Sequence, residues 1–363
     1  MLVFLLIVVG AIALFLFPFW LIPAAPFPQP SGQWRVGTTE LTWDSARYAG
    51  VIAKIWYPTN DIAGNSPYID NIGRTLSVMT TGLNPLVKLI FNRLYLGRVI
   101  TPALLNATIN HSSEGFPLIL FSPGFRGVNW INTFYALELA SHGFTVIGIN
   151  HPGSSAASLL ADGSQVKFKT LERDVFTDAD RFDAVLAETS QEQASNMSRV
   201  VDTSIALNSN SNSVLFQKIN VNKIFAAGHS IGGAASFIAC GQDKRIAKGI
   251  NFDGAFIDAI DTEYTDKELL LVCADRDKFR PKDLKMRLPY DQIMKRDALR
   301  IDQLANKANL KRIMLPMTDH LNFTDVPLII RPVVAKSIGL VGKVDGLEIL
   351  LKTSAIAIDF LER

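Results

Sequence analysis

Short apolar runs alternate with longer amphipathic segments along most of the chain. The apolar runs with the length of strands lie at residues 51–58, 116–124, 144–153, 223–228, 249–254, 268–275 and 311–320. The segments with apolar positions at helical spacing lie at residues 132–143, 178–207, 231–241, 290–310 and 345–363. Continuous apolar strands that alternate with helices are typical of a mostly parallel sheet covered on both faces. The pattern therefore predicts an α/β, doubly wound fold with a mostly parallel central sheet.

The N-terminal segment has a different pattern, because the first 34 residues carry no charged side chain. Residues 1–23 are apolar, and a helix rising about 1.5 Å per residue would let them cross the roughly 30 Å hydrocarbon core of a membrane. A cleaved signal peptide normally has a basic start and an apolar stretch of only about 7 to 15 residues, and this segment has neither. We expect a single transmembrane anchor here, with signal cleavage and secretion as the alternative.

The rest of the chain divides into a short spacer and one domain. Residues 24–33 are rich in proline and predict an extended linker, and residues 34–363 predict a single α/β domain. Within that domain, the region from about 60 to 110 departs from the alternation. It contains an apolar stripe made of Leu86, Leu89, Ile90, Leu94 and Tyr95. The stripe predicts either a helix packed against the core, or a cap or membrane-contacting insertion.

Composition and charge exclude several classes of function. The formal net charge is +2 over 363 residues and no long run of like charges occurs, so nothing indicates a nucleic-acid surface. The two cysteines, Cys240 and Cys273, lie in apolar stretches without C-x-x-C spacing, and we expect them to be buried hydrophobic side chains. No metal-ligand spacing such as H-E-x-x-H occurs, so we expect neither a metal nor a cofactor.

A candidate nucleophile lies between the predicted strand at 223–228 and the helix that follows. Gly228, His229, Ser230, Ile231 and Gly232 match the pattern G-x-S-x-G. In a strand–turn–helix context this pattern forms a sharp turn that exposes the serine on a strained backbone, and its neighbours must be small. The motif therefore predicts Ser230 as a nucleophile in an elbow flanked by two glycines.

A serine hydroxyl needs a base to remove its proton, and the chain has only five histidines. His320 follows the last predicted strand, where this architecture supplies the base in the chain order serine, acid, histidine. His229 is adjacent to the serine and should point away from it, and His142 suits a helix end. His151 follows a strand at the same sheet edge and could line the pocket. We expect His320 to be the base.

The remaining parts of such a site are an acid and an oxyanion hole. The acid orients the imidazole, and position alone leaves it open, because Asp253 follows one strand and Asp275 and Asp277 follow the next. The oxyanion hole needs one backbone N–H from the residue after the nucleophile and one from the loop after the third strand. These positions predict Ile231 and Phe125 as the donors.

Several stretches resemble the platelet-activating-factor acetylhydrolase family of α/β-hydrolases, from about residue 50 to the C-terminus. They are KIWYPT, FSPGFRG, LASHGFTVIGINHPGSSAAS, GHSIGGAA, NFDGAF and HLNFTD. The resemblance implies an α/β-hydrolase fold and an acid after the strand that follows the serine, which selects Asp253. It also implies His320 as the base and Phe125 and Ile231 as the oxyanion donors.

The chain departs from the family pattern in one place that bears on the acid. Pro123 stands where better-known members have histidine, and SPGF together with CADRD is also similar to cutinase-like polyester hydrolases. In those enzymes the acid follows the later strand, so Asp275 and Asp277 remain alternatives.

Taken together, the residues predict a serine ester hydrolase with a Ser-His-Asp triad. By resemblance, its substrates are phospholipids with short or oxidised acyl chains, and membrane lipid is its partner. The alternative is a general carboxylesterase or cutinase-like polyester hydrolase. A remote alternative, a non-catalytic membrane-tethered binding protein on a hydrolase scaffold, would lack a triad member, and none is missing.

Overall fold

The computed structural model describes residue 10 and residues 27–79, 96–171, 175, 177–255, 263–264, 266–275 and 284–363, with residues 284–290 described by their backbone alone. Three predictions fall outside these ranges: the anchor at 1–23 apart from Gly10, the apolar stripe at 86–95, and the alternative acid Asp277. Within the described ranges, no helix has both the length and the apolar character needed to cross a membrane.

The fold is built on one large sheet, which has nine strands over the described residues. Their order is β13 (Asn309–Leu315), β12 (Glu268–Ala274), β11 (Ile246–Phe252), β10 (Ile219–His229), β6 (Phe116–Ser122), β7 (Thr145–Gly148), β2 (Val51–Thr59), β1 (Arg35–Trp43) and β5 (Leu104–Leu105). Neighbours from β13 to β7 pair in parallel, whereas β2 is antiparallel to both β7 and β1. The predicted mostly parallel sheet is confirmed.

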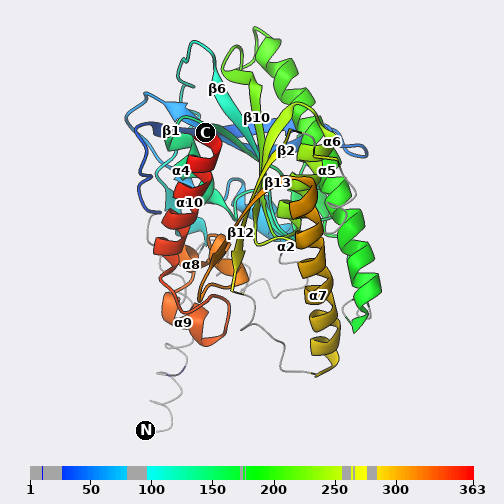
Figure 1. Cartoon of the computed structure of the whole chain (residues 1–363). Helices are drawn as coiled ribbons and strands as arrows, with labels where there is room; N and C mark the ends of the chain where they lie inside the picture. The colour runs from blue at the N-terminus through cyan, green and yellow to red at the C-terminus, as the bar shows by residue number, and fades with distance from the viewer. Residues whose placement is uncertain are drawn as a thin grey trace, which may run out of the picture.

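Helices cover both faces of this sheet (Figure 1). One face carries α4 (Thr133–Ser141), α8 (Val326–Ile329) and α10 (Gly346–Glu362), and the other carries α5 (Ala179–Ser209), α6 (Ile231–Gln242) and α7 (Leu284–Lys307). Strand β6 shows both layers, because successive side chains of a strand point to opposite faces. Ile119 and Phe121 pack in the core cluster under α4 and α10, while Leu118 and Leu120 pack in the cluster under α5 and α6.

Among the described residues, β1 is the one long strand that the apolar runs do not predict. Its sequence, RVGTTELTW, mixes polar with apolar residues, yet it pairs with β2 over nine residues, from Arg35 opposite Thr59 to Trp43 opposite Val51. It lies near the sheet edge, where one side of the strand faces solvent and a continuous apolar run is not required. The smaller elements are β3 (Ser66–Pro67), α2 (Ile72–Met79), η2 (Leu96–Arg98), β4 (Ile100–Thr101), β8 (Ala157–Leu159), β9 (Gln165–Lys167), η6 (His320–Phe323) and α9 (Pro332–Ser337).

The described part of the predicted linker, residues 27–33, packs on the domain. Phe27 is buried, its ring lies 4.9 Å from that of Tyr68, and its backbone N–H donates to the Ile100 carbonyl at 3.0 Å. Further along, the Ser31 hydroxyl donates to Glu138 of α4 at 2.7 Å. Proline gives this segment an extended conformation, and these contacts hold it against the first layer of helices.

A buried polar network lies behind β6, and it contains His151. The Ser122 hydroxyl donates to Gln193 Oε1 at 2.9 Å, so His151 Nε2–H must donate to Ser122 Oγ at 2.9 Å. His151 Nδ1 then accepts from Asn196 Nδ2 at 3.3 Å. The ring is fully buried, and burial lowers its pKa to about 3. His151 therefore lies in the core as a neutral imidazole, and the expectation that it lines the pocket is wrong.

Because His151 is neutral when folded but titrates near its usual pKa when unfolded, the unfolded state takes up a proton as the pH falls below about 6.5. We expect this group to lower the free energy of unfolding by about 2 kcal/mol between pH 7 and pH 5. Urea unfolding of the protein and of His151→Gln at both pH values measures the effect. The variant should lose that part of the pH dependence, and equal profiles for the two proteins would contradict the assignment.

Candidate active site

Ser230 stands at the junction between β10 and α6, as the G-x-S-x-G motif predicts. Its backbone has φ +57° and ψ −127°, a strained conformation for a residue with a side chain. The glycines at positions 228 and 232 are required because other backbone atoms lie very close to their Cα atoms. A Cβ at position 228 would collide with the carbonyl of Gly232, and one at position 232 would collide with the carbonyl of Ser122. The motif thus brings the start of α6 against the end of β6.

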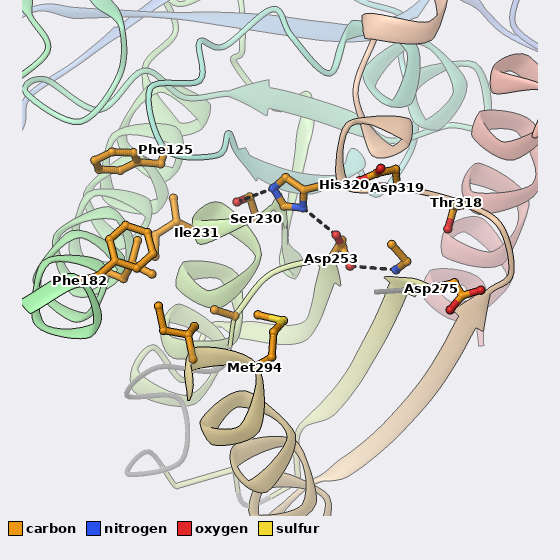
Figure 2. A pocket seen from close by; sticks show the side chains of 14 residues that line it. Phe125, Phe182, Ser230, Ile231, Asp253, Asp275, Met294, Thr318, Asp319 and His320 are labelled. Atoms are coloured by element: carbon orange, nitrogen blue, oxygen red, sulfur yellow. Dashed lines mark hydrogen bonds and ion pairs between the residues drawn. The ribbon is translucent and has the colours of Figure 1, made fainter. Parts of the chain in front are cut away.

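His320 and Asp253 lie in line with this serine (Figure 2). His320 Nε2 is 3.0 Å from Ser230 Oγ, and His320 Nδ1 is 2.6 Å from Asp253 Oδ2. A carboxylate only accepts, so Nδ1 carries the proton and Nε2 is left to accept from the serine hydroxyl. The Asp253 side chain is 1% exposed and that of His320 is 43% exposed. The pair therefore joins a buried charge to a histidine that substrate can reach.

The backbone around Asp253 holds the carboxylate in place. Asp253 follows β11 with a φ of +55°, and its second oxygen accepts from the Ala274 N–H at 2.8 Å. Asp275, one of the alternative acids, lies at the rim of the same cavity and accepts from the Met317 N–H at 3.5 Å. Of the two candidate acids that the structure describes, Asp253 and Asp275, it is Asp253 that bonds to the imidazole of His320.

The two predicted oxyanion donors lie beside the serine. A Cβ at Gly124 would lie 3.0 Å from Ser230 Cβ, so the loop that continues to Phe125 passes directly against Ser230. Ile231 is the first residue of α6, where a backbone N–H has no acceptor within the helix and the helix dipole is positive. Both residues border the cavity in front of Ser230. Their backbones can therefore face an oxygen bound there.

A cavity of about 380 Å³ opens in front of Ser230. One wall is apolar, and its main residues are Phe125, Phe182, Leu186, Ile231, Ile293 and Met294. The opposite side carries Thr318, Asp275 and Asp319, and burial raises the pKa of Asp319. In Figure 2, the side chains of Phe125, Phe182 and Met294 lie on the side of the cavity away from Thr318 and Asp319. The cavity can therefore bind an apolar group next to the nucleophile.

His229 has a contact that the sequence did not predict. Its Nε2–H donates to the carbonyl of His320 at 3.0 Å, and the two ring centroids are 4.5 Å apart. The prediction was only that His229 points away from the serine, and its side chain bonds to the backbone of His320. The sequence analysis also did not identify the cavity residues on α5 and α7, because they belong to no motif and lie far from Ser230 in the sequence. These residues are Phe182, Leu186, Ile293 and Met294.

The two cysteines are buried and are not joined by a disulfide bond, and burial raises the pKa of Cys240 to about 12. His142 lies at the C-terminal end of α4, where its Nδ1–H donates to the Glu138 carbonyl at 2.8 Å, as expected for a helix end. These residues take no part in the cavity.

The fold has a counterpart among solved structures. A ferulic acid esterase from Streptomyces cinnamoneus superimposes with a TM-score of 0.64 at 21% sequence identity, covering 94% of this chain and 93% of that one. This likeness supports the predicted α/β-hydrolase type of fold.

Curated relatives are similar over most of the chain. Platelet-activating factor acetylhydrolase of Bos taurus is 24% identical over 357 residues, which cover 93% of this chain and 76% of that protein. A probable 1-alkyl-2-acetylglycerophosphocholine esterase of Arthroderma benhamiae is 32% identical over 151 residues, or 41% of this chain and 34% of that protein. The predicted enzyme class, an ester hydrolase, is confirmed, and the alternative of a non-catalytic binding protein is set aside.

The model of the family described as "Platelet-activating factor acetylhydrolase, isoform II" matches residues 22–363. That match includes every residue described above around Ser230, and it agrees with the resemblance carried by the motifs. The chain belongs to the platelet-activating factor acetylhydrolase, isoform II, family.

Proposed function

We propose that this protein is a serine carboxylic-ester hydrolase in which Ser230 is the nucleophile, His320 the general base and Asp253 the acid that orients it. The observation that carries the proposal is the line of two hydrogen bonds, 2.6 Å from Asp253 to His320 and 3.0 Å from His320 to Ser230. The alternative acid Asp275 is less well supported, because the imidazole already bonds to Asp253.

In the first half of the reaction, Ser230 Oγ attacks the ester carbonyl carbon and its proton passes to His320 Nε2. Negative charge develops on the carbonyl oxygen, and the N–H groups of Phe125 and Ile231 donate to it. The buried Asp253 stabilises the imidazolium that forms. His320 then gives the proton to the leaving alcohol, which departs and leaves an acyl group on Ser230.

In the second half, water replaces the alcohol. His320 takes a proton from the water as it attacks the acyl carbon, and returns that proton to Ser230 Oγ when the acid leaves. The apolar wall of the cavity stands beside Ser230, so it binds the acyl chain through both halves of the reaction.

The substrate we propose is a phospholipid with a short or oxidised acyl chain, supported by family membership and by the esterase names of the relatives. The predicted N-terminal anchor, residues 1–23, would hold the enzyme at a membrane that contains such lipids, and the family match begins at residue 22, near the end of that segment. One observation favours a general carboxylesterase as a second candidate: a cavity of about 380 Å³ is much larger than an acetyl group.

The proposed function is tested with the full chain in detergent micelles. We expect an acetylated phospholipid to be hydrolysed faster than its long-chain counterpart and faster than a simple soluble ester, because the acyl chain of the substrate must fit the cavity beside Ser230. Release of the free acid is measured for the protein and for Ser230→Ala. Cleavage of the soluble ester alone would favour the general carboxylesterase, and full activity of the alanine variant would exclude Ser230 as the nucleophile.

A matched pair of variants tests the acid. Asp253→Asn should lower kcat by about 10⁴-fold, because an amide cannot hold the imidazole in the productive tautomer. Asp275→Asn, at the rim of the same cavity, should lower it by much less. Steady-state kinetics on one soluble ester compare the two. The assignment is wrong if Asp275→Asn shows the larger loss.

The apolar wall predicts a size limit on the acyl chain. Met294→Trp fills part of the cavity, so kcat/KM for an octanoyl ester should fall about tenfold relative to that for an acetyl ester. Met294→Leu, which keeps the volume, should leave the ratio unchanged. A series of esters of one alcohol measures it. Equal losses on both esters would show that this wall does not contact the acyl chain.

A further inference from the structure

Two segments far apart in the sequence meet beside the candidate active site. The first continues from β6 through Phe125 to α4, and the second runs from His320 in η6 to Asp325 at the start of α8. The Asp325 N–H donates to the carbonyl of Ile131 at 2.8 Å, and Asn132 Nδ2 donates to the carbonyl of Phe323 at 2.9 Å. The segment with the proposed base is therefore bound directly to the segment with a proposed oxyanion donor.

Asp325 makes the strongest of these connections, because it caps α4. Its side chain is fully buried, Oδ2 accepts from the Thr133 N–H at 2.8 Å, and Oδ1 accepts from the Phe134 N–H at 3.0 Å. These are the first two N–H groups of the helix, which no intrahelical acceptor can satisfy. Asn132 stands at the N-cap position with a suitable side chain, but that side chain does not cap the helix.

A third donor completes the site of this carboxylate. The Tyr68 hydroxyl donates to Asp325 Oδ2 at 3.0 Å from the region between β3 and α2. Burial raises the pKa of Asp325 to about 8, and the bonds from Phe134, Tyr68 and Thr133 act in the opposite direction. The carboxyl group thus accepts from three donors at the N-terminal end of α4.

The short helix η6 transmits this position to the imidazole. The Asp319 carboxylate accepts from the His320 N–H at 2.6 Å, and Asn322 Oδ1 accepts from the N–H groups of Asp319 and Gly342 at 2.8 and 2.7 Å. With these bonds, η6 has little freedom to adjust by itself. A shift at Asp325 therefore displaces His320.

We infer that Asp325 is a positioning residue, which fixes His320 and the Phe125 N–H relative to each other by joining the two segments that carry them. The inference rests on the proposed function, in which these two groups act on one bound ester. Asp325 itself lies away from the cavity, so it acts through the residues it holds.

The test compares Asp325→Asn with the parent at a temperature where circular dichroism shows both to be folded. One oxygen of the carboxylate becomes an NH₂ that faces backbone donors, so the two segments separate slightly. Because a displacement on the order of 1 Å can lower a rate about 10²-fold, we expect kcat to fall by about that factor with little change in KM. The rate of covalent labelling of Ser230 by a fluorophosphonate should fall in parallel.

Two further variants distinguish positioning from general destabilisation. Tyr68→Phe removes one of the three donors and should lower kcat in the same direction by a smaller factor. Thr353→Val removes the bond of 2.8 Å between Thr353 and Tyr135, which ties α4 to α10 on its other side. It should lower the melting temperature without lowering kcat.

The inference is overturned if folded Asp325→Asn keeps the kcat and labelling rate of the parent, or if Thr353→Val loses kcat equally at a matched loss of melting temperature. If Asp325→Asn does not fold, Tyr68→Phe decides, because it removes one of the three donors to the Asp325 carboxyl and leaves the other two in place. A loss of kcat in that variant supports the inference, and an unchanged kcat overturns it. Ser230→Ala, assayed in parallel, reports separately on the proposed function.

Discussion

The arrangement around Ser230 depends on one close contact between backbones. The first turn of α6 passes so near the end of β6 that a Cβ at position 232 would meet the carbonyls of Ser122 and Pro123. Only glycine permits this close approach of α6 to β6. The approach has two consequences. The serine is held with a positive φ at the sheet edge, and the loop after β6 is brought against it, with the Phe125 backbone beside the start of the helix.

The parallel sheet explains why the other groups meet there. The carboxyl ends of β10, β11 and β13 lie at one edge, and Ser230, Asp253 and the segment with His320 each follow one of these ends. The parallel strands therefore bring Ser230, Asp253 and His320 near one another, and local hydrogen bonds fix the orientation of their side chains. His229 holds the His320 carbonyl, and the Ala274 N–H holds the Asp253 carboxylate.

The sequence predicted the parallel part of the sheet and the turn at Ser230, because both have local patterns: apolar runs for strands, and G-x-S-x-G for the turn. The candidate acids were different, since Asp253 and Asp275 both follow strands and only the contact of Asp253 with His320 in three dimensions distinguishes them. Phe182 and Met294 gave no signal, because they become a wall only when α5 and α7 pack together. Asn132 stands at the N-cap position of α4, yet the helix takes its cap from Asp325, a partner 192 residues away from Thr133, which no local pattern indicates.

Because Phe27 packs on the domain, only a short stretch of chain separates the domain from the predicted anchor. Its ring packs against Tyr68, whose hydroxyl bonds to Asp325, so Phe27 is in contact with the group of residues that joins α4 to the segment with His320. Four residue steps separate Phe27 from residue 23, where the predicted anchor ends, and a fully extended chain covers about 14 Å in four steps. In an anchored enzyme, Phe27 would therefore lie no more than about 14 Å from the end of the anchor, which would keep the domain close to the membrane surface.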